Sequence, residues 1–251
     1  EIVATDARRS YITFQPLGVV LAVMPWNFPF WQVFRFAAPA LMAGNAAVLK
    51  HASNVPGCAL AIESVFREAG FPANLFRTLM IPASAVQEVI AHRYVKAVTL
   101  TGSESAGSSV ASLAGKMIKK SLLELGGSDA FIVLDDADLE QTIKTAVTAR
   151  MLNQGQSCIA AKRFIVTEGI AEAFTNGMKL AFEKLKMGDP LDADTQVGPL
   201  ARPDLVNDIE NQVKRSVEAG AVLVTGGKRI PGPGCFFEPT IVAGVKPGRA
   251  V

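Results

Sequence analysis

The hydrophobic positions of this 251-residue chain follow two patterns: short continuous runs, and longer stretches in which apolar residues recur every three or four positions. The short, β-rich runs predict strands at residues 18–24, 46–50, 75–80, 95–100, 120–125, 130–134, 162–167 and 221–225. The stretches between them predict helices at residues 56–69, 103–114 and 139–151. Strands that alternate with helices in this way are typical of an α/β fold with a parallel sheet and crossover helices.

Polar residues mark where the helices are expected to begin. Ser53 and Asn54 are candidate caps for the helix at 56–69, and Ser84 with Gln87 forms a capping box for a further short helix. Aspartates at positions 135, 136 and 138 precede the helix at 139–151, where negative charge stabilises a helix N-terminus. Two later helices carry apolar stripes within residues 170–185 and 205–217, which we interpret as core packing.

Composition and charge argue against several classes of protein. Hydrophobic residues make up 49% of the chain and charged residues 19%, which is enough for one large domain or two modest ones and is not a disordered composition. The net charge is only +2 and basic residues are scattered, which argues against binding to nucleic acid or to an anionic membrane. The apolar runs are interrupted by Pro, Gly or Asn before they reach about 20 residues, so no membrane span is expected.

Cysteine and histidine content bears on the compartment and on metal binding. Cys58, Cys158 and Cys235 are odd in number and widely spaced, which argues against a disulfide framework and favours a reducing, cytoplasmic environment. The two histidines, His51 and His92, lack ligand-spaced partners, so we expect no metal site. The chain starts without Met and stops in an expected loop, and we interpret it as a fragment of a longer protein.

The stretch MLNQGQSCIAA, residues 151–161, places Cys158 at a polar turn. A structural thiol usually packs inside an apolar run, whereas this one follows Gly, Gln and Ser. A thiolate near backbone N–H groups is the setting that activates a cysteine as a nucleophile. The alternative is an incidental free thiol, which is how we interpret Cys58 and Cys235.

Two features at expected strand ends suit a phosphate-bearing ligand. In LTGSESAG, residues 100–107, a strand ends, Gly102 and Ser103 turn the chain, and a helix begins, so backbone N–H groups and a helix N-terminus face a possible phosphate. Lys50 ends another strand, and α/β sheets bind ligands at such ends. The alternatives are an ordinary glycine turn and a surface lysine, and we interpret His51 as a turn residue.

Two further residues suit acid–base chemistry and charge stabilisation. Glu124 lies between leucines at a strand end, where a carboxylate is costly to ionise and suits a general base; an outward-facing side chain is the alternative. Asn27 lies on an irregular turn shortly before Pro29, where its amide could donate to a developing oxyanion. We interpret the aromatic residues around it as pocket walls or core: Trp26, Phe28 and Phe30.

In this order, the motifs resemble those of the aldehyde dehydrogenase superfamily. The matching segments are PWNFP, LKHAS, TGS with a glycine four residues later, ELGG and GQSC. The spacings between them agree as well, and the resemblance runs from about residue 14 to the end of the chain. Five ordered motifs are specific where each one alone is weak.

The resemblance implies a fold and a set of roles. Residues 1–125 would form a Rossmann-type NAD(P)-binding domain and residues 126–251 a second α/β catalytic domain, both incomplete. Cys158 would attack the aldehyde carbon to give a thiohemiacetal, which passes hydride to the nicotinamide and leaves a thioester. Asn27 and the Cys158 N–H would stabilise the oxyanion, and Glu124 would activate the water that hydrolyses the thioester. The positions that match cofactor contacts are Trp26, Lys50, Ser53, Gly102, Ser103 and Leu125.

The resemblance also bears on cofactor choice and substrate. Members that prefer NAD often carry a glutamate where this chain has Ser53, and a carboxylate there would repel the 2′-phosphate of NADP, so we expect NADP to be accepted. The run from residue 18 to residue 59 resembles the succinate-semialdehyde dehydrogenase branch, in which an arginine at the place of Arg35 can bind the substrate's distal carboxylate. Leu152 departs from this branch, because some members have a second arginine there. Glu124 favours water over coenzyme A as the acyl acceptor.

We therefore expect an NAD(P)-dependent enzyme that oxidises a small aldehyde, with succinate semialdehyde as the expected substrate and a homo-oligomer as the full-length assembly. A broad-specificity aldehyde dehydrogenase is one alternative. Another is a cysteine hydrolase or acyltransferase that uses Cys158 and Glu124 without nicotinamide, although no histidine lies nearby in the sequence. A third is a non-catalytic remnant kept as a binding module. The family's Glu-Phe-Gly-Pro motif would lie beyond Val251.

Overall fold

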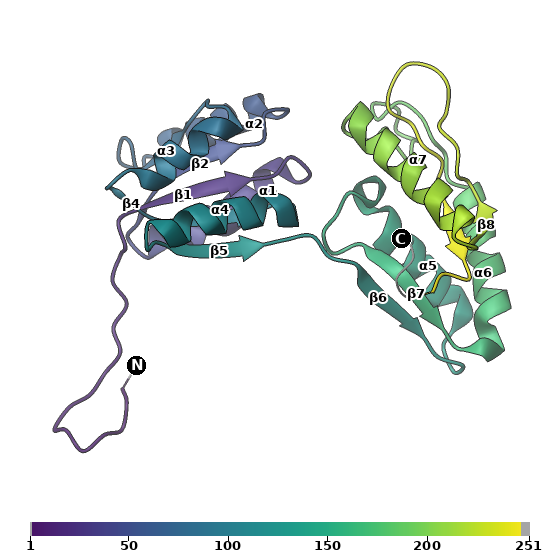
Figure 1. Ribbon diagram of the computed structural model, residues 1–251, viewed down its shortest axis with the longest axis horizontal. Coiled ribbons are helices and arrows are strands. Elements are labelled where there is room, and N and C mark those ends of the chain that lie inside the picture. The colour runs from purple at the N-terminus through teal and green to yellow at the C-terminus, as the bar shows by residue number, and fades with distance from the viewer. Residues whose placement is uncertain (1, 247–251) are drawn as a thin grey trace. The chain divides into compact units, whose positions relative to one another are not determined.

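The chain divides into two units, residues 1–126 (unit 1) and residues 127–251 (unit 2), each with hydrophobic cores of its own (Figure 1). The computed structural model describes residues 2–246. Strands alternate with helices, and the strands of the larger sheet run parallel, so the predicted α/β fold is confirmed.

Unit 1 is built on a five-stranded sheet with the strand order β3-β2-β1-β4-β5. Its strands are β1 (Val19–Met24), β2 (Ala46–His51), β3 (Phe76–Thr78), β4 (Val95–Thr101) and β5 (Lys120–Glu124). Its helices are α1 (Pro29–Met42), α2 (Pro56–Glu68), α3 (Val86–Ala91) and α4 (Glu104–Lys116). A short 3₁₀ turn, η1 (Ala83–Ala85), precedes α3.

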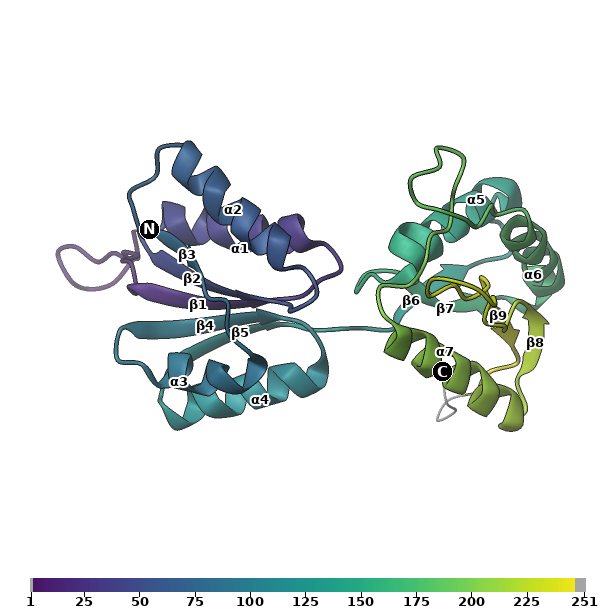
Figure 2. The same ribbon diagram turned by 90° about the horizontal axis from the view of Figure 1, so that it is seen from above.

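Helices cover both faces of this sheet, α1 and α2 on one face and α3 and α4 on the other (Figure 2). Neighbouring residues of β1 are therefore both buried: Leu21 packs in the core beside α3 and α4, and Ala22 in the core beside α1 and α2. Burial on both faces is typical of a parallel sheet with crossover helices. It explains why these strands are continuous apolar runs and not alternating ones.

The strand order creates a switch point beside β1. The chain moves outward from β1 to β2 and β3, and then returns to place β4 on the other side of β1. In open parallel sheets, ligands bind beyond the carboxyl ends of the strands at such a point. The carboxyl edge of this sheet is therefore the place in unit 1 to look for a binding site.

Two of the predicted helix starts differ from those in the structure. The caps predicted at Ser53 and Asn54 are wrong: the residue before α2 is Val55, no side chain caps it, and the helix begins at a proline whose fixed φ suits the first helical turn. The predicted capping box of Ser84 and Gln87 is also wrong, because residues 83–85 form the 3₁₀ turn and α3 has no side-chain cap.

Elsewhere side-chain capping does occur, at α4 and at α5 (Leu139–Met151). Ser103, which was expected to be the first residue of its helix, is the cap of α4, and its Oγ accepts a hydrogen bond of 3.3 Å from the Ala106 N–H. The Asp138 carboxylate caps α5 by accepting from the Gln141 N–H at 3.0 Å. Each cap satisfies a backbone donor that the first turn of a helix leaves unpaired.

Unit 2 contains a parallel strand pair, β6 (Asp129–Val133) and β7 (Ala161–Val166), connected through α5. The 3₁₀ turn η2 (Leu152–Gly155) follows α5 and leads to Cys158 and then to β7. The remaining elements are α6 (Glu168–Glu183), α7 (Pro203–Glu218) and an antiparallel pair of β8 (Val222–Thr225) and β9 (Ile241–Ala243). The apolar stripe of α6 packs in a core with β6 and α5 through Phe174, Met178 and Phe182.

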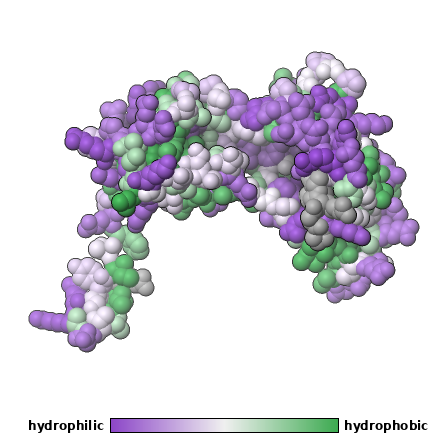
Figure 3. Space-filling model, viewed as in Figure 1, coloured by the Kyte–Doolittle hydropathy of each residue, from purple (hydrophilic) through white to green (hydrophobic). Residues whose placement is uncertain are grey.

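The surface of α7 shows the pattern expected of an amphipathic helix. Val206 and Val213 are buried, whereas the outward face of the helix is hydrophilic (Figure 3). Within residues 2–246, no helix has the length and apolar character that crossing a membrane requires.

Two glycines of α4 predict opposite effects of the same substitution. A Cβ added at Gly107 would lie 2.6 Å from Cδ2 of Leu125, whereas a Cβ at Gly115 meets nothing within 4 Å. We expect Gly107→Ala to lower the free energy of unfolding by about 1–3 kcal/mol through overpacking. Gly115→Ala should raise it by up to about 1 kcal/mol, because alanine favours the helix. Urea unfolding of both variants measures the difference, and equal changes would contradict the packing described here.

Candidate active site

Most of the predicted site residues of unit 1 lie at the carboxyl edge of its sheet. Because β1, β2, β4 and β5 are parallel and in register, their last residues meet at one edge. The residues in or directly after these strand ends are Trp26, Asn27, Lys50, Gly102, Ser103, Glu124 and Leu125. Ser53 follows close behind β2 on an exposed turn. The sheet therefore gathers side chains that are up to about a hundred positions apart in the sequence.

Asn27 lies in the turn between β1 and α1. Its Oδ1 accepts a hydrogen bond of 3.1 Å from the Phe28 N–H, so the oxygen of the amide is used within the turn. The group of this side chain that can donate to an oxyanion is therefore Nδ2.

The turn is also held by His51, which the sequence analysis interpreted only as a turn residue. The ring of His51 is buried at the end of β2, and its Nε2 lies 3.0 Å from the Pro29 carbonyl oxygen. Its Nδ1 lies 2.9 Å from the Ala52 nitrogen and 3.3 Å from the Met24 carbonyl oxygen, and the tautomer with the proton on Nε2 satisfies both Pro29 and the Ala52 N–H. A signal for this role was present, because Ala47, Leu49 and His51 follow the period-two burial of β2.

Burial changes the titration of two side chains at this edge. Burial lowers the pKa of His51, and the charge of Lys50 lowers it further, against the opposing effect of its backbone hydrogen bonds. Burial likewise lowers the pKa of Lys50. A half-buried lysine at the end of a parallel strand has incomplete solvation, which an anionic ligand could replace.

Glu124 is not in the apolar surroundings that the sequence suggested. Its Oε2 lies 2.9 Å from Nη2 of Arg35 on α1, and the two side chains are 53% and 43% exposed. The reason is the position of β5 at the edge of the sheet, which leaves Leu122 exposed as well. The structure thus brings together the predicted base and the predicted substrate-binding arginine, as an exposed ion pair.

The turn that carries the predicted nucleophile, residues 152–158 and called the nucleophile turn below, has an unusual backbone. Asn153, Gln154 and Gly155 have φ values of 52°, 55° and 74°, all in the left-handed region. For residues other than glycine this costs roughly 1–2 kcal/mol each, and such strain is found at functional sites. The turn places Cys158 half-buried immediately before β7.

Polar side chains hold this strained turn in place. Gln156 donates through Nε2 to the Asn153 carbonyl at 3.1 Å and accepts from the Ala201 N–H at 3.0 Å through Oε1. Lys162, which the sequence analysis did not consider, donates through Nζ to the carbonyl oxygens of Ser157 and Cys158, each at 3.3 Å. The polar composition around the thiol therefore has a structural cause.

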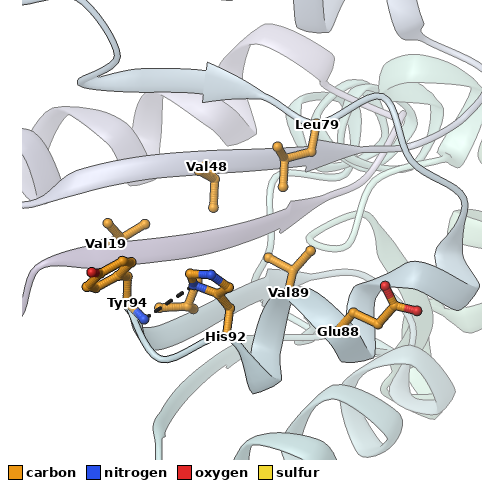
Figure 4. A pocket seen from close by; sticks show the side chains of 8 residues that line it. Val19, Val48, Leu79, Glu88, Val89, His92 and Tyr94 are labelled. Carbon is orange, nitrogen blue, oxygen red and sulfur yellow. Dashed lines mark hydrogen bonds between the residues drawn. The ribbon is translucent and has the colours of Figure 1, made fainter.

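A metal site and a separate hollow are the other kinds of site to compare with the sheet edge and the nucleophile turn. Among the residues that the structure describes, no group of three or more His, Cys, Asp or Glu side chains could hold a metal ion. A mostly apolar hollow of about 440 Å³ lies between α3 and the sheet, lined by residues such as Val19, Val48, Val89, His92 and Tyr94 (Figure 4). None of the predicted site residues lines it.

Comparison with known proteins places the whole chain in one family. The model described as "Aldehyde dehydrogenase family" matches residues 1–251. A relative from Synechocystis sp., named as a probable succinate-semialdehyde dehydrogenase (NADP+), is 58% identical over 98% of this chain and 54% of its own length. The succinate-semialdehyde dehydrogenase (NADP+) of Mycolicibacterium paratuberculosis is 56% identical over 98% of this chain and 52% of its own length.

Solved structures agree with this result. The succinic semialdehyde dehydrogenase of Streptococcus pyogenes, solved in complex with NADP+, superposes with a TM-score of 0.96 at 44% identity, covering 99% of this chain and 55% of that one. The chain belongs to the aldehyde dehydrogenase family, and it spans about half the length of the curated relatives it matches.

The buried His51 predicts acid sensitivity of the fold. Because its pKa lies below the ordinary value of 6.5 in the folded state, the unfolded chain takes up the proton more readily, and stability is lost as the pH falls. We expect the melting temperature to drop between about pH 7 and pH 5, and His51→Gln to flatten that dependence. His92→Gln is the matched control. An unchanged slope in His51→Gln would contradict the assignment.

Proposed function

We propose that the protein containing this chain oxidises an aldehyde to the carboxylic acid with NADP, and that succinate semialdehyde is its substrate. The observation that carries this proposal is the set of polar residues gathered at the carboxyl edge of unit 1, each at its family motif. The names of the relatives, which are 44–58% identical and NADP-linked, support the same activity.

In this proposal Cys158 is the nucleophile. Its thiolate sulfur bonds to the aldehyde carbon, and the carbonyl oxygen becomes an oxyanion that accepts hydrogen bonds from Nδ2 of Asn27 and from the Cys158 N–H. A bound nicotinamide would supply the acceptor for the hydride that this carbon loses, so that the thiohemiacetal on Cys158 becomes a thioester. Glu124 then removes a proton from water as the water attacks the thioester, and the acid leaves with the thiolate restored.

The residues at the sheet edge suit a dinucleotide phosphate. Ser103 caps α4, and the N–H groups at the start of this helix favour an anion. Lys50 lies at the end of β2, on the same edge of the sheet. Ser53 offers a small hydroxyl where a carboxylate would repel a 2′-phosphate. Trp26, Gly102 and Leu125 complete the proposed contacts. We assign cofactor binding to residues 1–125 and the nucleophile to residues 126–251.

Arg35 is proposed to bind the distal carboxylate of the semialdehyde. Its guanidinium already pairs with the carboxylate of Glu124, which supports its ability to bind the carboxylate of a substrate. A dicarboxylic semialdehyde and Glu124 would therefore compete for the same side chain. Leu152 offers no second cation, so recognition of the distal carboxylate would rest on Arg35. We further propose that the full-length protein is a cytoplasmic homo-oligomer, which the family resemblance and the three free cysteines support.

The decisive experiment uses the full-length gene product and its Cys158→Ala variant. Reduced nicotinamide is followed by absorbance with succinate semialdehyde and with butanal, each with NADP and with NAD. We expect turnover that favours the semialdehyde and disappears in Cys158→Ala, and a KM for the semialdehyde that rises about tenfold in Arg35→Gln while butanal is little affected. Ester cleavage without any nicotinamide reduction would indicate a cysteine hydrolase, and turnover of butanal alone would contradict the substrate assignment.

Ser53 predicts the choice between the two dinucleotides. Ser53→Glu adds a negative charge where the 2′-phosphate of NADP is proposed to bind, so we expect kcat/KM with NADP to fall about tenfold and kcat/KM with NAD to hold or rise. Ser53→Gln, similar in size but neutral, is the control and should retain the preference for NADP. Equal losses in both variants would show that size, not charge, matters at this position.

A further inference from the structure

Lys162 makes an unusual set of contacts for a lysine. Its Nζ donates to the Gly127 carbonyl oxygen at 2.6 Å and to those of Ser157 and Cys158 at 3.3 Å each. An ammonium group has three donors, and here each has a backbone acceptor. Two of the three acceptors belong to the peptide groups on either side of Cys158.

Because a peptide group is planar, these contacts fix the direction of the N–H groups on either side of Cys158. The Ser157 carbonyl and the Cys158 N–H belong to one planar trans peptide group, so they point in opposite directions. The same holds for the Cys158 carbonyl and the Ile159 N–H. Because both carbonyls converge on Nζ of Lys162, both N–H groups are directed away from it. Within residues 2–246 no backbone carbonyl accepts from the Cys158 N–H, so this donor is available to another acceptor.

The charges around the nucleophile turn are mainly positive. Lys162 lies close enough to interact electrostatically with Cys158, Arg150 and Asp129. Arg150, in the last turn of α5, is half-buried, and its Nη1 is buried with no hydrogen-bond partner among the residues described. Two cations and one carboxylate therefore lie in the neighbourhood of this turn.

The partial burial of the Lys162 side chain supports this arrangement. Burial lowers its pKa, and so does the charge of Arg150, while Asp129 and Cys158 act in the opposite direction. A surface lysine without such contacts would extend into solvent and so avoid both the burial and the repulsion from Arg150. Here the ammonium instead donates to three carbonyl groups, two of them in the nucleophile turn and the third at Gly127.

We propose that Lys162 is the positioning residue of the nucleophile: its ammonium orients the Cys158 N–H as an oxyanion donor, and its positive charge attracts negative charge on the Cys158 sulfur. This inference rests on the proposed function of Cys158. It assigns Lys162 to the reaction without contact to the reacting atoms, through the backbone carbonyls that it holds and through its charge.

A neighbouring residue offers a matched control. Arg163 donates through Nε to the Ser128 carbonyl oxygen at 2.8 Å, so it also anchors the chain before β6, whereas none of the hydrogen bonds that hold the nucleophile turn involves it. Arg163→Gln removes a cation and a backbone anchor one residue away. Any effect that is merely structural or due to net charge should therefore appear in Arg163→Gln as well.

The test compares Lys162→Gln, Lys162→Arg and Arg163→Gln in the full-length gene product. The first readout is the rate of Cys158 alkylation by iodoacetamide across the pH range, measured by mass spectrometry on the tryptic peptide that begins at Met151. The second is kcat and KM for aldehyde oxidation, and the third is the melting temperature. Alkylation reports the thiolate without any cofactor or aldehyde.

We expect Lys162→Gln to slow alkylation at neutral pH about tenfold, because the sulfur loses the attraction of a nearby cation. Its kcat should fall by a similar or larger factor with little change in KM, because the N–H orientation is also lost. Lys162→Arg should restore alkylation, since it keeps the charge, but only part of kcat. Arg163→Gln should match the wild type in both.

Other results would overturn the inference. Equal alkylation profiles and equal kcat in Lys162→Gln and the wild type would do so, as would equal losses in Arg163→Gln. If Lys162→Gln does not fold, Lys162→Arg decides: wild-type kcat there would remove the orienting role, and alkylation as slow as that of an unfolded thiol would remove the charge role. If alkylation responds as expected but no aldehyde is oxidised by the wild type, the proposed function fails while the effect of Lys162 on the thiol stands.

Discussion

Strand direction is the constraint on which unit 1 depends. Parallel strands need crossover connections, and the helices of those crossovers bury both faces of the sheet. Every strand then ends at the same edge of the sheet, so the residues that follow the strands lie at that edge. Asn27, Lys50, Ser103 and Glu124 come to one edge of the sheet because of this direction.

Unit 2 solves a different problem, which is to display a thiol on a fixed loop. Here no sheet edge gathers the parts, and the backbone takes left-handed conformations at Asn153 and Gln154 that it would otherwise avoid. Such a turn persists only when its surroundings hold it. Gln156 and Lys162 supply that support through hydrogen bonds to backbone groups. The left-handed backbone of this turn therefore depends on the hydrogen bonds that hold it.

Much of the fold could be predicted from the sequence, because its signals are local. Continuous apolar runs located the strands to within a few residues, and the aspartate at position 138 does cap α5. The errors at Ser53, Asn54 and Ser84 arose where polar residues near a helix start compete with a proline or a 3₁₀ turn. A cap requires one backbone geometry, and the residue type alone does not fix it.

The site was less predictable, because its decisive contacts join distant parts of the chain. His51 needs the Pro29 carbonyl, Lys162 needs Gly127, and neither partner is visible in a local motif. The exposure of Glu124 follows from the edge position of β5, which is a property of strand order and not of the residues around it. The motifs identified candidate residues, whereas their environments required the fold.

The pairing of Glu124 with Arg35 has a consequence for the solvent. Both side chains are about half exposed, so mobile ions can approach the pair and screen it over a distance of about 10 Å at 0.1 M salt. The freedom of the carboxylate therefore depends on ionic strength as well as on protonation. Because the two paired atoms are only 2.9 Å apart, well within that distance, salt weakens the pair without abolishing it, and rising ionic strength shifts the carboxylate gradually toward unpaired positions.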